Sequence, residues 1–224
     1  MRVYQVVVAA VVLGTALPIA LHHSVHGVVS PHQIALAFFL WLNTIIALWE
    51  ICLFLRIGLI EEQHARFITE YKGRELARVK DFFGARISPS RIFAPSTWAE
   101  IWSSYSVFDP SYADRRSFGF FIDVGNGFST LLPSLGCLYG MTFHVLPARA
   151  LGLVLLLACY QMLYGTIVYF GSFVMNRRYV GHTLGNLALF VGLSNGIWMT
   201  FPAWGIWAAL RLIYEGSYAV FLDL

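Results

Sequence analysis

Long apolar runs with almost no charge constrain this chain more than any other feature. Five runs of this kind cover residues 3–21, 33–60, 117–143, 150–175 and 184–210. A helix needs about 20 mostly apolar residues to cross the hydrocarbon core of a bilayer. The runs are continuous, whereas the strands of a membrane barrel alternate apolar and polar residues. The sequence therefore predicts an all-α, polytopic membrane protein: a single domain over residues 1–224, built as a bundle of five transmembrane helices.

The composition supports this class and excludes others. Apolar residues make up 58% of the 224 positions and charged residues 12%, about half the charged share of a soluble domain. The net charge of +3 does not provide the basic surface that nucleic-acid binding requires. Such high hydrophobicity also excludes intrinsic disorder. We therefore expect membrane lipids around the chain and no nucleic-acid partner.

The cysteines suggest neither a disulfide framework nor a zinc site. Cys52, Cys137 and Cys159 are far apart, lie in apolar runs and form no CxxC pair. Glycines spaced as GxxxG occur at 136–140, 181–185 and 192–196. This spacing is compatible with close helix packing inside one bundle and with a homodimer.

The first apolar run has two interpretations. Arg2 followed by residues 3–20 has the layout of a cleaved signal peptide, but its apolar core is longer than a usual signal core, which favours a retained span. Four histidines follow in what we expect to be a short loop: His22, His23, His26 and His32. Imidazole is a common metal ligand, yet this loop has no acid or cysteine to complete a site. We interpret the histidines as interfacial loop residues and predict no metal and no cofactor.

Residues 61–116 form the one long polar segment. Charges of both signs at helical spacing over 61–81 predict an exposed or interfacial helix. Three prolines are expected to break the remainder into turns: Pro89, Pro95 and Pro110. Trp98, Trp102 and Tyr105 predict an interfacial aromatic belt that leads into the third span.

Two carboxyl groups, Glu50 and Asp123, lie deep in predicted spans. A charge at the centre of a bilayer costs at least about 2.5–3.5 kcal/mol, so such an acid persists where it faces a polar cavity, pairs with another group or is protonated. A protonated acid in apolar surroundings is a good proton donor. The alternative is a structural carboxyl that bonds to a neighbouring helix. With two such acids in five helices, we favour a functional role.

Polar residues share faces of four predicted spans. They are Asn43 with Glu50, Asp123 with Asn126 and Thr130, Gln161 with Tyr164, and Asn195 with Trp198. Because lipid would leave these groups without partners, we expect the four faces to converge on an intramembrane cavity. The alternative is interhelical hydrogen bonding that only holds the bundle together. A cavity of acids and aromatic rings suits an apolar ligand and carbocation chemistry, in which an acid protonates an alkene and an aromatic face stabilises the cation.

Four short motifs occur in order between about residues 40 and 210. They are Trp102-x2-Tyr105-x3-Asp109 followed by Tyr112, the span acid Asp123, Gln161-x2-Tyr164-Gly165-x3-Tyr169-Phe170, and Asn195-x2-Trp198-x3-Pro202. In this order and placement, the motifs resemble the EXPERA superfamily, which includes the emopamil-binding-protein-like sterol isomerases and the sigma-2 receptor. The second-span acid Glu50 also matches the superfamily pattern. The resemblance implies a membrane location, in the endoplasmic reticulum if the source is eukaryotic.

The resemblance also implies residue roles. The catalytic set would be Glu50 and Asp123 as proton-handling acids, Trp198 facing the cation and Asn195 orienting an acid or a polar substrate group. The substrate-binding set would be Asn43, Tyr105, Asp109, Asn126, Thr130, Gln161 and Tyr164, with Tyr105 and Asp109 at the cavity mouth. The sequence departs from the sterol isomerase pattern at three positions: Ile46 stands in place of a histidine, Asp123 in place of glutamate and Asn126 in place of threonine. These departures favour a related isoprenoid or polycyclic substrate as well as a sterol.

The leading functional hypothesis is a cofactor-free double-bond isomerase for a hydrophobic small molecule, a sterol or a related polycyclic isoprenoid. The reaction would run by protonation and deprotonation through a carbocation. One alternative is a membrane-bound terpenoid or pericyclic cyclase on the same scaffold. Another is a non-enzymatic sterol- or lipid-binding protein, like the sigma-2 receptor.

Overall fold

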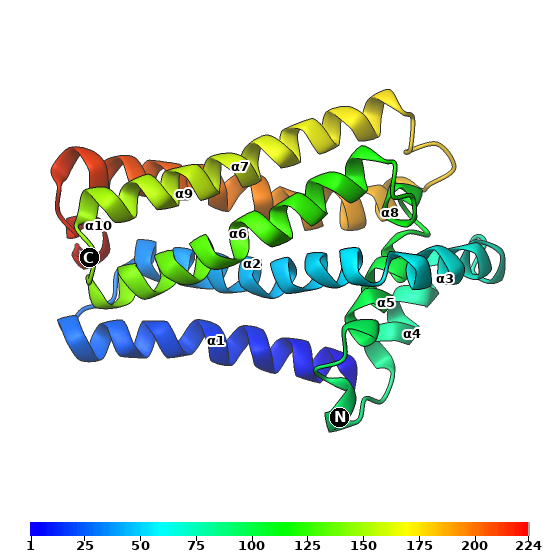
Figure 1. Cartoon of the computed structure of the whole chain (residues 1–224), viewed down its shortest axis with the longest axis horizontal. Coiled ribbons are helices and arrows are strands. Elements are labelled where there is room, and N and C mark those ends of the chain that lie inside the picture. The colour runs from blue at the N-terminus through cyan, green and yellow to red at the C-terminus, as the bar shows by residue number, and fades with distance from the viewer. Residues whose placement is uncertain (224) are drawn as a thin grey trace. The chain divides into compact units, whose positions relative to one another are not determined.

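The structure is a computed structural model that describes residues 1–223, and at position 190 the backbone alone. Within this range the chain forms helices joined by turns and no strand, apart from one isolated bridge between Arg2 and Arg86. The all-α prediction is therefore confirmed. Figure 1 traces the helices in chain order. The long ones are α1 (Val3–His26), α2 (Pro31–Leu55), α6 (Phe118–Phe143), α7 (Ala148–Met175) and α9 (Ser194–Glu215).

Four helical segments of the described chain are long and apolar enough to cross a membrane. They are Val3–His26, Pro31–Leu55, Ala148–Met175 and Leu184–Glu215. The last combines α8 (Leu184–Asn186), the π-helix η3 (Leu187–Leu193) and α9. Four such segments are compatible with a multi-pass membrane protein. The fifth predicted span is α6, which has the length but carries Asp123 and Asn126 on its polar face, so the count of five remains a prediction.

Two helix boundaries differ from those expected. The first helix continues to His26, so that His22, His23 and His26 are helical and not in a loop. It ends at Gly27, whose φ of 74° is the left-handed conformation that glycine adopts at a helix C-terminus, and its N–H donates to the His23 carbonyl oxygen at 2.8 Å. The second helix ends at Leu55, not at residue 60, because the backbone of Arg56 leaves helical geometry.

The polar segment forms short helices. They are α3 (Ile57–Glu70), α4 (Glu75–Gly84), η1 (Pro89–Arg91), α5 (Pro95–Tyr105) and η2 (Pro110–Ala113). The single helix predicted over 61–81 is divided in two by a turn that contains Gly73 at φ 72°. The prolines break the chain as expected, and each opens the next helix, where its missing N–H costs nothing.

Contacts divide the chain into two compact units. Unit 1 consists of Met1–Ala9, Ala47–Phe128 and Val168–Ser194. Unit 2 consists of Ala10–Ile46, Ser129–Ile167 and Asn195–Leu224. In unit 1, Val3, Phe82 and Ile87 form a small buried cluster, and the buried Arg78 guanidinium pairs with Glu100 at 2.5 Å.

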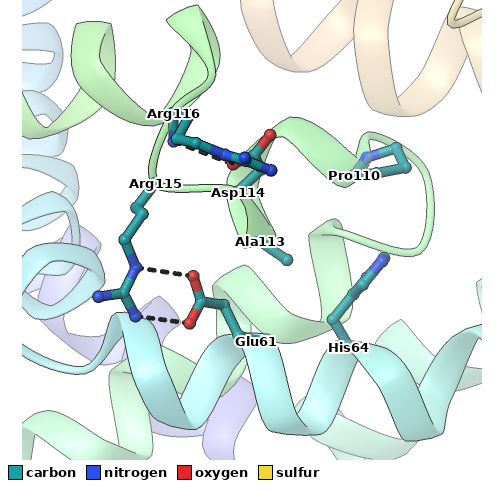
Figure 2. Close-up of a pocket in the computed structure, with 7 residues that line it drawn as sticks. All are labelled: Glu61, His64, Pro110, Ala113, Asp114, Arg115 and Arg116. Carbon is teal, nitrogen blue, oxygen red and sulfur yellow. Dashed lines mark hydrogen bonds and ion pairs between the residues drawn. The ribbon is translucent and has the colours of Figure 1, made fainter.

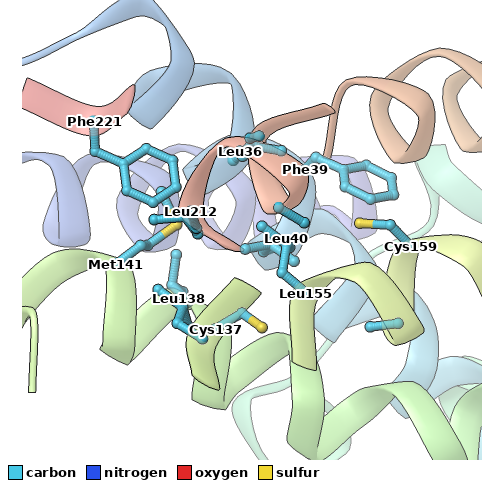
Figure 3. Close-up of a cluster of buried hydrophobic side chains, with 14 of the residues drawn as sticks. Leu36, Phe39, Leu40, Cys137, Leu138, Met141, Leu155, Cys159, Leu212 and Phe221 are labelled. Atoms are coloured by element: carbon cyan, nitrogen blue, oxygen red, sulfur yellow. The ribbon is translucent and has the colours of Figure 1, made fainter. Parts of the chain in front are cut away.

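Unit 2 contains the larger hydrophobic core (Figure 3). It combines side chains of α2, α6, α7, α9 and the short C-terminal helix α10 (Ala219–Leu222), among them Leu36, Phe39, Met141, Leu155, Cys159, Leu212 and Phe221. The helices approach closely where one of them has glycine. A Cβ on Gly152 of α7 would lie 2.9 Å from the Ala209 carbonyl oxygen of α9, so a glycine is needed there.

Leu155 and Leu157 of α7 provide a matched test of this core. Leu155 is 1% exposed and Leu157 is 68% exposed. Leu155→Ala is expected to lower the free energy of unfolding in detergent by about 2–5 kcal/mol, because it leaves a cavity among tightly packed side chains. Leu157→Ala should leave it nearly unchanged. Equal losses in the two variants, measured by denaturant titration, would contradict the assignment of this face of α7 to the core.

Candidate functional site

The deep acids meet where α6 crosses α2 in unit 1. A Cβ on Gly127 of α6 would lie 2.8 Å from the Glu50 Cβ and 3.0 Å from the Ala47 carbonyl oxygen of α2. Such distances are shorter than ordinary van der Waals contacts, so this approach requires glycine. Asp123 precedes Gly127 by one helical turn and therefore lies on the same face of α6. The crossing thus brings the two predicted acids onto facing helices.

The two carboxyl groups differ in their partners. Glu50 is 5% exposed, and its Oε2 has no hydrogen-bond partner among the described residues. Glu50 interacts electrostatically with the carboxyl group of Asp123. Asp123 is partly buried and is hydrogen-bonded by the Tyr112 hydroxyl. One acid is therefore held by a donor, while one oxygen of the other is free.

Tyr112 comes from the η2 turn and is 3% exposed. Its ring centroid lies 5.2 Å from that of Trp102 and 5.1 Å from that of Tyr105. Burial, and then the neighbouring Asp123 carboxyl, raises the pKa of the Tyr112 hydroxyl well above its usual range. The phenol consequently keeps its proton at neutral pH and can act as a donor.

Asp109, in contrast to Glu50, has a partner for each of its carboxyl oxygens. Its Oδ1 accepts the Ser111 N–H at 3.0 Å, which caps η2. Its Oδ2 accepts the Tyr169 hydroxyl at 3.0 Å and lies 3.5 Å from the Arg178 guanidinium. Through these partners, Asp109 holds the η2 turn, and so Tyr112, in place.

The aromatic residues of α5 pack inside unit 1. The Trp102 Nε1–H donates to the Trp49 carbonyl oxygen at 2.7 Å, beside Glu50 on α2. Trp102 is 7% exposed, so this residue is part of the interior and not of the expected interfacial belt. The Tyr105 hydroxyl lies 3.4 Å from the Ser194 Oγ.

A second polar network lies in unit 2 and centres on Asn43. Its Nδ2 donates to the Thr130 Oγ1 and to the Ser134 Oγ, both at 3.0 Å. Its Oδ1 accepts the Trp198 Nε1–H at 3.0 Å. The indole of Trp198 is thus fixed by a buried amide. Separately, the Gln161 amide donates to the Ser129 hydroxyl.

The predicted site residues therefore fall into two sets. Unit 1 contains Glu50, Tyr105, Asp109, Asp123 and Asn126, and unit 2 contains Asn43, Thr130, Gln161, Tyr164, Asn195 and Trp198. Within these sets, an electrostatic interaction joins Glu50 to Asp123, and hydrogen bonds join Asn43 to Thr130 and Trp198. Tyr164 is 55% exposed and stacks on Tyr160. Asn126 and Asn195 are partly buried.

Sequence reasoning assigned no role to Tyr112, Tyr169 or Gly127. Tyr112 and Tyr169 lie within the sequence motifs, but the motifs did not indicate their partners. Tyr112 is hydrogen-bonded to Asp123, and Tyr169 donates to Asp109. Gly127 follows Asp123 by four residues, a spacing that could have indicated a close helix crossing at the acid.

A separate pocket of about 540 Å³ lies on the polar side of unit 1 (Figure 2). Charged residues line it, and they pair with one another. The Arg115 guanidinium donates to both oxygens of Glu61, at 2.9 and 2.6 Å, and Arg116 lies 3.3 Å from Asp114. The Arg115 hydrogen bonds hold the pKa of the Glu61 carboxyl below its usual range. These pairs compensate the charge of the pocket lining. Neither the pocket nor its ion pairs were predicted from the sequence.

Comparisons of the chain with protein-family models, with curated proteins and with solved structures find no match.

The crossing of α2 and α6 can be tested with two glycines of one helix. Gly127→Ala should lower the free energy of unfolding by about 1–3 kcal/mol, because the new methyl group must push α6 away from the α2 backbone. A Cβ on Gly125 would meet nothing within 4 Å, so Gly125→Ala is the matched control. Thermal unfolding in detergent measures both variants. A Gly127→Ala protein as stable as the control would show that the helices do not cross this closely.

Proposed function

We propose that this chain is a cofactor-free double-bond isomerase for a sterol or a related polycyclic isoprenoid. The observation that supports it best is the acid pair, Glu50 and Asp123, on facing helices. The Tyr112 phenol is hydrogen-bonded to Asp123. The ordered motifs that resemble the EXPERA superfamily support the same chemistry.

The different surroundings of Glu50 and Asp123 suggest which of the two carboxyl groups carries a proton. Two like charges this close in poorly hydrated surroundings repel strongly, so in our proposal the pair holds one proton. Glu50, with a free Oε2, carries that proton and delivers it to an alkene carbon. Asp123, with Tyr112 donating to it, is the carboxylate.

The reaction then balances without a cofactor. The alkene takes the Glu50 proton and becomes a carbocation, and Asp123 removes a proton from an adjacent carbon, which shifts the double bond. One proton enters and one leaves, so loss of the Asp123 proton to water and uptake of a proton from water by Glu50 restore the starting state. The resemblance implies that the ring face of Trp198 stabilises the cation, and in unit 2 the indole of this residue is held by Asn43. Asn195 keeps the orienting role that the resemblance implies.

Acids beside aromatic rings also suit an amine-bearing or sterol ligand that is bound without turnover. The rings of Trp102 and Tyr105 lie beside that of Tyr112, which donates to Asp123, and they favour this second candidate because aromatic rings attract cations. A cyclase would start with the same protonation and differ in the carbon skeleton of its product. Chemical analysis of the product therefore separates the three functions.

The isomerase proposal predicts the behaviour of the acid variants. Glu50→Gln and Asp123→Asn should each lower kcat by about 100- to 10,000-fold, because each removes one proton-transfer group. Glu62→Gln changes an exposed acid of α3 and should leave kcat unchanged. The measurement is conversion of sterol and polycyclic isoprenoid substrates by membranes of an expression host, followed by mass spectrometry.

The same assay in heavy water tests the proton-in, proton-out scheme. The product should carry one deuterium at the carbon where the new C–H bond forms. Product without label, or unchanged turnover in both acid variants, would reject the scheme. Substrates that bind tightly but are never converted by the wild type would favour the binding protein.

A further inference from the structure

Three histidines gather in unit 2, where the end of α1 meets the link between α6 and α7. They are His22 and His26 of α1 and His144, which directly follows α6. One ring nitrogen from each lies within 4.8 Å of the other two. The ring centroids of His26 and His144 are 3.9 Å apart, and those of His22 and His26 are 4.6 Å apart.

Backbone carbonyls determine which ring nitrogen carries the hydrogen in His22 and in His26. The His22 Nδ1 lies 3.1 Å from the Met141 carbonyl oxygen, and the His26 Nε2 lies 3.1 Å from the Thr142 carbonyl oxygen. A carbonyl only accepts, so these two nitrogens carry the hydrogens. In the neutral rings, the His22 Nε2 and the His26 Nδ1 are therefore bare lone pairs. A ring N–H directed at a backbone carbonyl is how proteins orient histidines that bind metals.

Two of the remaining nitrogens are buried without a partner. The His22 Nε2 and the His144 Nε2 make no hydrogen bond with any described group. His22 is 0% exposed, so water does not replace the missing partner at the surface. A buried polar atom without a partner is costly, and a metal ion among the three rings would satisfy the His22 lone pair.

His144 is also held in an unusual conformation. Its φ of 52° lies in the left-handed region, which residues other than glycine rarely occupy. Tyr218 stacks on its ring, with centroids 3.8 Å apart, and the Tyr218 hydroxyl donates to the Leu146 carbonyl oxygen at 2.7 Å. Strain of this kind persists where the surroundings enforce it, commonly at binding sites.

We propose that His22, His26 and His144 bind one zinc ion, which ties the end of α1 to the α6–α7 link. Three neutral imidazoles suit a first-row transition metal and not calcium or magnesium, which require oxygen ligands. Tetrahedral zinc places its nitrogen ligands about 3.4 Å apart, so the rings must move inward as the ion binds. The fourth position is open to water or to another small ligand. This site is independent of the acid pair, which belongs to unit 1.

Metal content and geometry test the proposal on the full chain, purified in detergent with a tag that contains no histidine. After a chelator has removed all metal, the protein should take up one zinc per chain in calorimetry and elemental analysis, and its unfolding temperature should rise with zinc. Cobalt(II) in place of zinc should give the visible absorption of a tetrahedral ion. Less than stoichiometric uptake, or a cobalt spectrum like that of the hydrated ion, would overturn the proposal.

Single substitutions identify the ligands. His26→Gln and His144→Asn should each weaken zinc binding by at least 10-fold, and asparagine tolerates the positive φ at position 144. His23→Gln is the matched control, because His23 is exposed on the same turn of α1 and should bind zinc as the wild type does. Unchanged zinc affinity in the double variant His26→Gln/His144→Asn would show that the ion is held elsewhere and refute the site.

Discussion

The close crossing of α2 and α6 at Gly127 is the contact on which the acid pair depends. Without a side chain at this position, the backbone of α6 reaches the Ala47 carbonyl and the Glu50 Cβ. Two acids on separate helices thereby become neighbours in apolar surroundings. In unit 2 the same two helices are joined by the amide of Asn43, which bonds to Thr130 and Ser134. Small and polar residues, not large apolar ones, thus define how these helices meet.

The buried polar groups of the chain fall into two kinds. Asp109 has a donor for each oxygen and an arginine beside it, and Asn43 uses its amide nitrogen and its oxygen. These groups hold the fold in place. The Glu50 Oε2, the His22 Nε2 and the His144 Nε2 lack partners within the described chain. An unpaired buried group destabilises a protein, and these are the atoms to which our two proposals assign a substrate and an ion.

Much of the local structure was predictable from the sequence, since it follows from short-range effects. The prolines at 89, 95 and 110 break the polar segment, and the apolar runs form the long helices, as expected. The ends of α1 and α2 were misplaced because hydropathy alone locates neither the glycine cap at Gly27 nor the break at Arg56. Glu50 and Asp123 stood out as candidates because a deep acid is costly wherever it lies.

The groupings of these residues came only from the tertiary structure. The sequence showed four nearby histidines in an expected loop, but the partner that completes the cluster, His144, lies 118 residues after His26. The sequence likewise gave no reason to pair Tyr112 with Asp123 or Trp102 with the Trp49 carbonyl. Helix formation, membrane compatibility and the cost of buried charge depend on residue type and spacing along one segment, so the sequence by itself determined them. Which side chains meet depends on how distant helices cross, and this was decided by long-range packing.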